Sequence, residues 1–160
     1  MIILGVDPGL TQTGFGLISI KEDHPKIIDF GVIQPNRNDT LSIRLHTIYI
    51  DMEQLIQTFS PTVLSIEDVF YGRNVKSALL LGQARGIAML CAAKNNMPVF
   101  EYSAKKVKQS VTGNGNADKV QLQYMIKQIF NLKSLPKPLD ASDAIGIALC
   151  HFNQVKIEEL

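Results

Sequence analysis

Blocks of apolar residues separated by polar and turn residues predict that the chain begins with three strands. Ile2–Asp7 is a continuous apolar run that ends in an acid before the turn residues Pro8 and Gly9, as expected of a buried central strand. Gly14–Ile20 and Ile27–Ile33 are typical of two further strands, joined by a polar segment. Together the three predict an antiparallel meander.

The rest of the chain alternates between helical and strand patterns. Apolar residues recur every three or four positions from Leu41 to Phe59, which predicts an amphipathic helix that ends before Pro61. Six further blocks follow: a strand at Thr62–Ile66, a long helix within Val75–Asn95, a strand at Met97–Tyr102, and helices at about Ala104–Val111, Val120–Phe130 and Ala141–Asn153. This order predicts an α/β fold with a mixed five-stranded sheet flanked by helices.

Acidic side chains stand where predicted elements end or begin. A right-handed crossover makes the first and fourth strands parallel neighbours, so Asp7 and Glu67 are expected side by side at one edge of the sheet. Asp140 and Asp143 are three residues apart near the start of the last helix and can point to one side. If the two pairs meet, four carboxylates share one small site.

Such a cluster predicts divalent cations. Like charges 4 Å apart repel by roughly 4 kcal/mol at an effective dielectric constant of 20, so the four acids stay ionised only when cations bind them. Oxygen ligands select Mg²⁺, with Mn²⁺ as a substitute, over zinc. Two such ions can activate a water and stabilise the leaving oxygen of a phosphodiester.

Each acid also has a structural alternative. Asp7 can simply begin a turn, and Glu67 can be the solvated end of a strand. Asp140 can be an N-cap and Asp143 a first-turn acid favoured by the helix dipole. The joint pattern of the four, rather than any one of them, favours the metal site.

Charge is distributed unevenly along the 160 residues, which we expect to form a single domain, 1–160. The net charge is only +1, but residues 73–139 contain eleven Lys or Arg and two acids, a net charge of +9. This segment is either a solvated helical face or a track for a polyanion. Neither Cys91 nor Cys150 has metal-ligand spacing, and no apolar run approaches the roughly 18 residues of a membrane span. We therefore expect a cytoplasmic protein with reduced thiols.

Several residues of the basic segment are candidates for contact with nucleic acid. Lys105, Lys108 and Lys119 can pair with phosphates, or they can be ordinary surface lysines. Gly113 and Gly115 permit either a close approach of the backbone to a phosphate or a positive φ in a loop.

Two further features lie in the loop after the fourth strand and in the helix that follows it. Phe70 directly follows the acidic strand and Arg73 is part of a predicted loop, so the ring can stack on an unpaired base or belong to the core. Ala78, Gly82 and Gly86 recur every four residues, which favours close packing of this helix on its copy across a two-fold axis, or else on its own sheet.

Motifs along the whole chain resemble the bacterial RuvC resolvases. They are Asp7-Pro8-Gly9 with Gly14 and Gly16, Ile66-Glu67-Asp68-Val69-Phe70, Leu81-Gly82-Gln83-Ala84-Arg85-Gly86, Val107-Lys108-Gln109, Gly113-Asn114-Gly115 with Lys119, and Asp140-Ala141-Ser142-Asp143-Ala144. The resemblance implies a ribonuclease-H-like homodimer that nicks opposed strands of a four-way (Holliday) DNA junction symmetrically, with Mg²⁺, in recombination and repair. It also implies a branch-migration partner of the RuvAB type.

The same resemblance assigns roles to individual residues. The catalytic and metal-binding acids carry over to Asp7, Glu67, Asp140 and Asp143, the junction-contacting lysines to Lys108 and Lys119, and the aromatic residue near the scissile region to Phe70.

Three other classes of protein share parts of the pattern. A ribonuclease-H-like enzyme that cuts RNA or an RNA–DNA hybrid would use the same acids and metals. A sugar kinase or actin-like ATPase also opens with a strand and Asp-x-Gly, but it needs a second domain for which 160 residues leave no room. A non-catalytic junction-binding module would repel phosphate with these acids unless cations bridged them.

Overall fold

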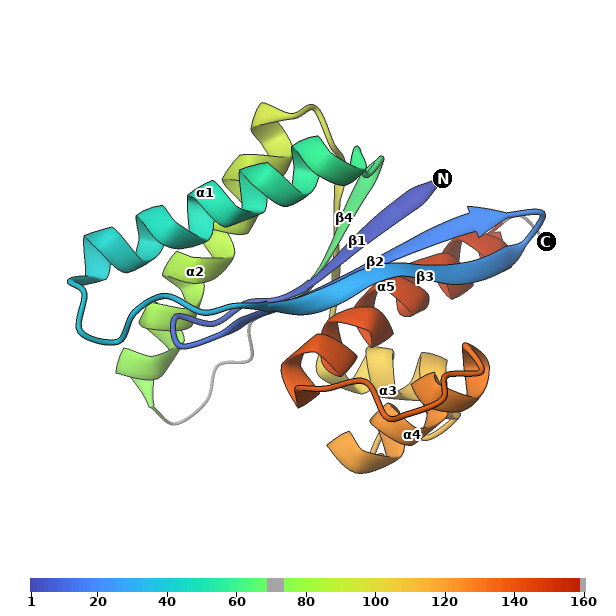
Figure 1. Ribbon diagram of the computed structural model, residues 1–160. Coiled ribbons are helices and arrows are strands. Elements are labelled where there is room, and N and C mark those ends of the chain that lie inside the picture. Colours follow the sequence, from blue (N-terminus) through green and yellow to red (C-terminus); the bar gives the residue numbers. More distant parts are fainter. Residues whose placement is uncertain (69–73, 159–160) are drawn as a thin grey trace.

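The computed structural model of the chain describes residues 1–68 and 74–158. These residues form a five-stranded sheet with helices on both faces (Figure 1), which confirms the predicted α/β fold. In chain order the elements are β1 (Ile2–Asp7), β2 (Thr13–Lys21), β3 (His24–Ile33), α1 (Leu41–Phe59), β4 (Val63–Glu67), α2 (Val75–Lys94), β5 (Val99–Tyr102), α3 (Ala104–Thr112), α4 (Lys119–Ile129) and α5 (Leu139–Glu158).

The sheet has the strand order β3-β2-β1-β4-β5. The first three strands form the predicted antiparallel meander, and β4 pairs with β1 in parallel, as the crossover through α1 requires. β5 extends the parallel half beside β4. The carboxyl ends of β1, β4 and β5 therefore lie at one edge of the sheet.

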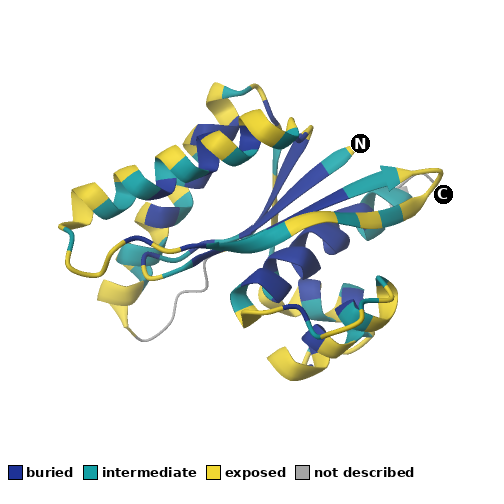
Figure 2. Cartoon of the chain, in the orientation of Figure 1, coloured by how far each residue is buried: buried dark blue, intermediate teal, exposed yellow. Residues whose placement is uncertain are grey.

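Two hydrophobic cores separate the helices into two layers. Leu4 and Val6 face α1 and α2, whereas Ile3 faces α5, because successive side chains of a strand point to opposite faces. Helix α5 is covered in turn by α3 and α4 (Figure 1). The central strands and the sheet-facing side of α5 are buried (Figure 2), so the position of α5 relative to the sheet is tightly fixed.

A row of small residues lets the backbone of α5 approach the sheet closely. Gly16, Gly5 and Ser65 are register partners on β2, β1 and β4. A Cβ atom at Gly5 would lie 2.1 Å from the carbonyl oxygen of Ala144, and one at Gly16 would lie 2.7 Å from the Ile145 nitrogen. The Ser65 hydroxyl donates to the Ile147 carbonyl at 3.0 Å. A larger residue in this row would push α5 away.

Gly5→Ala is therefore expected to lower the free energy of unfolding by about 2–3 kcal/mol or more, since the new methyl group meets backbone that cannot rotate away. The control is Gly146→Ala on α5, where a Cβ meets only side chains at 3.5 Å and the helix propensity improves. Urea denaturation of both variants measures the difference. Equal stability of Gly5→Ala and the wild type would contradict the close contact.

The structure corrects two predicted boundaries. β3 begins at His24 rather than Ile27, because Glu22 and Asp23 form a two-residue turn with φ of 48° and 61°, which lets both strands run to the turn. Helix α5 begins at Leu139, two residues earlier than predicted, and continues to Glu158. Asp140 is consequently a first-turn residue and not an N-cap.

The prediction that no segment resembles a membrane span also needs correction. Helix α2 has 20 residues and is long and apolar enough, by length and composition alone, to cross a membrane, with 22% of its most apolar stretch buried. Its Arg85 forms an ion pair with Glu101 at 2.7 Å, and its inner face joins the core with α1. This helix is thus a packed layer of the domain with one apolar face turned outward.

Candidate active site

Two of the acidic residues, Asp7 and Glu67, lie two positions after Gly5 and Ser65 of the row of small residues, on the same face of the sheet. Asp7 shares a sheet face with Gly5 and pairs with Gly14, and Glu67 occupies the next position after the Val6–Ile66 pair. The first turn of α5 lies over this edge: a Cβ atom at Gly14 would come within 2.1 Å of the Asp140 carbonyl oxygen. The close approach of α5 therefore brings its acids onto the strand ends.

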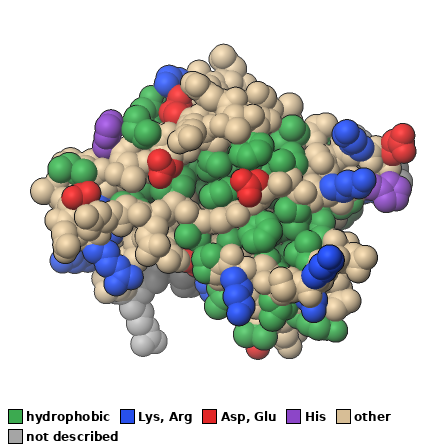
Figure 3. Space-filling model, in the orientation of Figure 1, with side chains coloured by type: hydrophobic (Ala, Val, Ile, Leu, Met, Phe, Trp, Pro, Cys, Tyr) green, Lys and Arg blue, Asp and Glu red, His purple; other side chains and the backbone are tan. Residues whose placement is uncertain are grey.

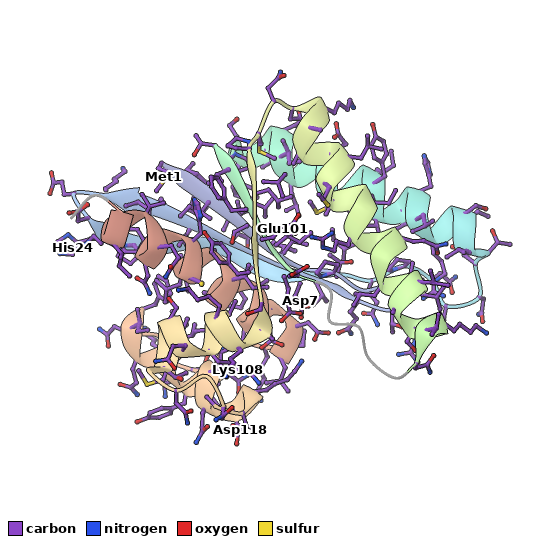
Figure 4. The ribbon with its side chains drawn as sticks, turned by 180° about the vertical axis from the view of Figure 1, so that it is seen from behind. Met1, Asp7, His24, Glu101, Lys108 and Asp118 are labelled. Carbon is purple, nitrogen blue, oxygen red and sulfur yellow. The ribbon has the colours of Figure 1, made fainter. Side chains whose placement is uncertain are left out.

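Three of the four predicted acids meet closely. Oxygen atoms of Asp7, Asp140 and Asp143 lie within 4.8 Å of one another. Glu67 completes the group, since it lines the same cavity of about 130 Å³ with Asp7 and Asp143. At roughly 30 Å³ per water, a cavity of this size has room for a metal ion and a few waters. Figure 4 shows Asp7 at the end of its strand, with helix α3 and Lys108 beside it.

The cluster is electrostatically unfavourable without a cation. Burial, with the charges of Glu67, Asp143 and Asp140, raises the pKa of Asp7 from 3.8 to about 8. Burial and the Asp143 charge also raise the pKa of Glu67. A group of carboxylates that resists ionisation at neutral pH is the expected state of a site built for divalent cations.

Lys119 partly neutralises the acids. Its Nζ atom lies 2.8 Å from Asp143 Oδ2 and 3.9 Å from Asp140 Oδ1. The pKa of Asp143 is raised by burial, although the hydrogen bond from Lys119 opposes the rise. The pKa of Lys119 is also raised, because the hydrogen bond to Asp143 and the nearby acids outweigh the lowering by burial. A capping box between Asp118 and Gln121 begins α4 and fixes the turn that carries Lys119.

Arg85 supports the site from the opposite layer, and the sequence reasoning did not find it. Its Nε atom donates to the Glu67 carbonyl at 3.3 Å, and its Nη2 atom lies 2.7 Å from Glu101 Oε2. Arg85 thereby ties β4 to β5 and holds the backbone of Glu67 in place. The only signal in the sequence was its presence in a motif of the resemblance, because Arg85 and its two partners lie on three separate elements.

Comparisons with known proteins agree along nearly the whole chain. A family model described as crossover junction endodeoxyribonuclease RuvC matches residues 3–151. The RuvC of Alkaliphilus oremlandii is 43% identical over 160 residues, which cover 100% of this chain and 98% of that protein. This chain belongs to the RuvC family. The RuvC of Saccharophagus degradans is 47% identical over 152 residues, 95% of this chain and 87% of that one.

The fold of this chain also matches the solved structures of RuvC proteins. The structure of Thermus thermophilus RuvC in complex with a Holliday junction substrate superposes with a TM-score of 0.93 at 28% identity, covering 99% of this chain and 96% of that chain. The predicted family and ribonuclease-H-like fold are confirmed. RuvC nucleases depend on metal, and the acid cluster of this chain could bind it.

The predicted phosphate contacts of this RuvC-family chain occupy different places. Lys108 lines the acid cavity together with Lys119, whereas Lys105 is exposed on α3 beside the loop at Gly115. Gly113 ends α3 with a φ of 76°, so the predicted need for a positive φ accounts for this glycine. The Gly115 N–H donates to Gln109 Oε1 at 3.0 Å. Phosphate binding by these residues stays a prediction.

Of the other predicted residues, those on α2 lie away from the cavity. Phe70 and Arg73 fall outside the described residues. Ala78 is half-buried, and Gly82 and Gly86 are exposed, with nothing within 4 Å of an added Cβ. His151 on α5 is buried, with its Nδ1 atom 2.8 Å from Tyr102 Oη. It lies about three helical turns from Asp140 along α5.

Proposed function

We propose that this chain is a structure-selective endonuclease that resolves four-way DNA junctions by paired, symmetric nicks in recombination and repair. One observation carries this proposal: the ends of two parallel strands and the first turn of α5 bring four acids together. Asp7, Glu67 and Asp143 line one cavity, and the Asp140 carboxylate lies within 4.8 Å of those of Asp7 and Asp143. Similarity to RuvC over the whole chain supports the choice of substrate. The single nuclease domain would comprise residues 1–160.

The donor set of the cavity fits Mg²⁺, with Mn²⁺ as a substitute. All four candidate ligands are carboxylates, hard oxygen donors that zinc sites rarely use alone. The proposal is two ions per active site, which supply an activated water and stabilise the leaving oxygen of the phosphodiester. The charges of all three other acids act on Asp7, so Asp7 would hold the metal together with them.

The remaining residues of the site would place the DNA. Lys108 and Lys119 line the cavity beside the acids, where their ammonium groups can bind phosphate oxygens. The amino end of α5 adds a positive dipole at the same edge of the sheet. Stacking of Phe70 on a base at the junction belongs to the proposal as well.

Lys119→Ala is expected to weaken junction binding and to reduce the slope of log K against log salt by about 1, the value for one phosphate contact. The matched control is Lys127→Ala on the same helix, which does not line the cavity. Fluorescence anisotropy at several salt concentrations gives both slopes. Equal slopes for Lys119→Ala and the wild type would remove Lys119 from the phosphate-binding residues.

The outer face of α2 is the proposed dimer interface. Val75, Leu79 and Leu90 are 70%, 64% and 56% exposed, and with Gly82 and Gly86 they recur at three- or four-residue intervals along one face. The two glycines would let a second copy of α2 pack closely on this face, and the contact would bury the large apolar side chains beside them. A two-fold dimer would present two equivalent active sites to two opposed strands.

Gly86→Leu is expected to shift the protein from dimer to monomer, because the new side chain fills the space that the second helix would occupy. Among residues 1–68 and 74–158, no atom of a neighbouring element lies within 4 Å of an added Cβ, so folding should not suffer. Gln57→Leu adds a leucine at an exposed position of α1 and serves as the control. Sedimentation velocity distinguishes the species, and an unchanged dimer in Gly86→Leu would place the interface elsewhere.

Partners and location follow from family analogy alone. The proposal includes recruitment by a branch-migration motor of the RuvAB type and a cytoplasmic site of action. A pull-down with purified RuvAB on junction DNA tests the first.

Substrate choice tests the proposed function itself. The chain, Mg²⁺ and equal amounts of a four-way DNA junction, a linear DNA duplex and an RNA–DNA hybrid are combined in separate reactions. The proposal expects cleavage of the junction well above the other two. Preference for the hybrid would retain the nuclease and reject the resolvase.

A further inference from the structure

A groove adjoins the acid cavity on the side of α4. It has a volume of about 760 Å³ and runs between the start of α4 and the first turn of α5. Lys119 and Asp140 line it; Asp140 belongs to the acid cluster, and the Lys119 ammonium group lies 3.9 Å from its carboxylate. The groove is therefore continuous with the proposed site of cleavage.

The floor of this groove is apolar although it faces solvent. Val120, the second residue of α4, is 63% exposed, and Leu139, the first residue of α5, is 38% exposed. Pro138 lies beside them. In the lower part of Figure 3, hydrophobic and basic side chains lie next to one another over this part of the molecule. Neither Val120 nor Leu139 belongs to the buried cores, so packing does not explain them.

Lysines at the edge of the groove suit an anion. Lys119 and Lys137 both line it, and Asp140 is the one acid among its lining residues. A nucleotide combines the two required features, a flat apolar base and a charged phosphate. Other polyanions with no apolar part would leave the floor uncovered.

The walls of the groove are held in position. The carbonyl oxygen of Pro136 accepts a hydrogen bond from Gln123 Nε2 at 2.6 Å and another from Ser142 Oγ at 2.7 Å. Both donors are buried, Gln123 at 6% exposure and Ser142 at 0%. These bonds fasten the segment that carries Lys137 to α4 and α5. A preformed groove binds a ligand with little loss of conformational entropy.

We propose that this groove seats the nucleotide next to the scissile phosphate, with its base over Val120 and Leu139 and its outer phosphate on Lys137. The inference rests on the proposed function, because the acids must hold the scissile phosphate for the groove to receive its neighbour. Successive nucleotides rise by about 3.4 Å along a strand, so a strand held at the acids must cross the adjoining surface. The affinity for DNA would then depend on how well the flanking base packs against the apolar floor of the groove.

Abasic substitution combined with Leu139→Ala tests the base contact. Four-way junctions carry a single abasic nucleotide at each position flanking the cut, and binding is measured in Ca²⁺. For the wild type, one flanking position is expected to weaken binding about fivefold when abasic. Leu139→Ala should show about the same loss on the intact junction and no further loss at that abasic position. Ile157→Ala, an exposed apolar residue at the other end of α5, is the control.

Lys137→Ala tests the phosphate contact. Losing one contact should make the affinity ratio of wild type to variant fall by about 3.5-fold between 50 and 200 mM salt. Lys133→Ala, an exposed lysine outside the groove lining, should leave the ratio unchanged.

The outcomes separate the two proposals. If Leu139→Ala stays as sensitive to every abasic position as the wild type, the groove does not hold a base and this inference is overturned, while junction cleavage can still stand. If the wild type neither binds nor cuts any junction, the proposed function fails and the inference fails with it.

Discussion

Asp7→Asn is expected to slow junction cleavage by roughly 10³-fold or more while junction binding stays within about threefold of the wild type. The carboxylate lies among the oxygens of Asp140 and Asp143, where an amide can neither carry the charge nor bridge two cations. In the proposed site DNA binding would rely instead on Lys108 and Lys119, which the substitution leaves in place. Single-turnover cleavage and anisotropy with the same labelled junction measure the two effects.

The control for this variant is Asp29→Asn, which removes an exposed carboxylate on β3. It should cleave at the wild-type rate. Asp7→Asn should also be more stable than the wild type in EDTA at pH 8, by an amount on the order of a few kcal/mol, because the amide is not repelled by the neighbouring acids. Wild-type cleavage by Asp7→Asn would contradict the metal role of this residue.

Mg²⁺ affinity is expected to rise by about tenfold per pH unit between pH 6 and 8 and to level off above that range. The pKa of Asp7 is about 8, so each ion that binds at lower pH must displace its proton. The raised pKa values of Glu67 and Asp143 act in the same direction. Isothermal titration calorimetry without DNA, in buffers of different ionisation enthalpy, measures both the affinity and the proton release.

The same pKa sets the stability of the metal-free protein. Folded Asp7 holds its proton up to about pH 8, whereas the unfolded carboxyl loses it near 3.8. The folded state therefore binds more protons between these values, and its free energy of unfolding falls as pH rises through this window. Saturating Mg²⁺ should reverse the loss at pH 8. Metal affinity that does not change between pH 6 and 8 would show that Asp7 is already ionised.

Most of the fold could be predicted because each element has a strong local pattern. The apolar run before Asp7 and the helical spacing from Leu41 to Phe59 both fix an element type without reference to the rest of the chain. The wrong boundaries are places where local pattern is weak. The turn at Glu22 and Asp23 has no glycine to mark its positive φ, and prolines before Leu139 hid the true start of α5.

The candidate site was predicted to a similar extent and for similar reasons. The four acids could be found because each follows a strand or opens a helix, and topology then brings those ends together. Arg85 and the groove at Leu139 could not, since both depend on contacts between elements distant in sequence. The pairing of Lys119 with Asp143 was likewise invisible until the start of α4 was placed beside α5.

Mapping the nicks on a synthetic four-way junction tests the central claim most directly. Each strand is labelled separately, the wild type is added with Mg²⁺, and the products are treated with DNA ligase. The account predicts two nicks at matching positions on opposed strands, both sealed by ligase, and neither made by Asp7→Asn. Binding of the junction without cuts under Mg²⁺ or Mn²⁺ would contradict it and leave a binding protein whose acids are structural.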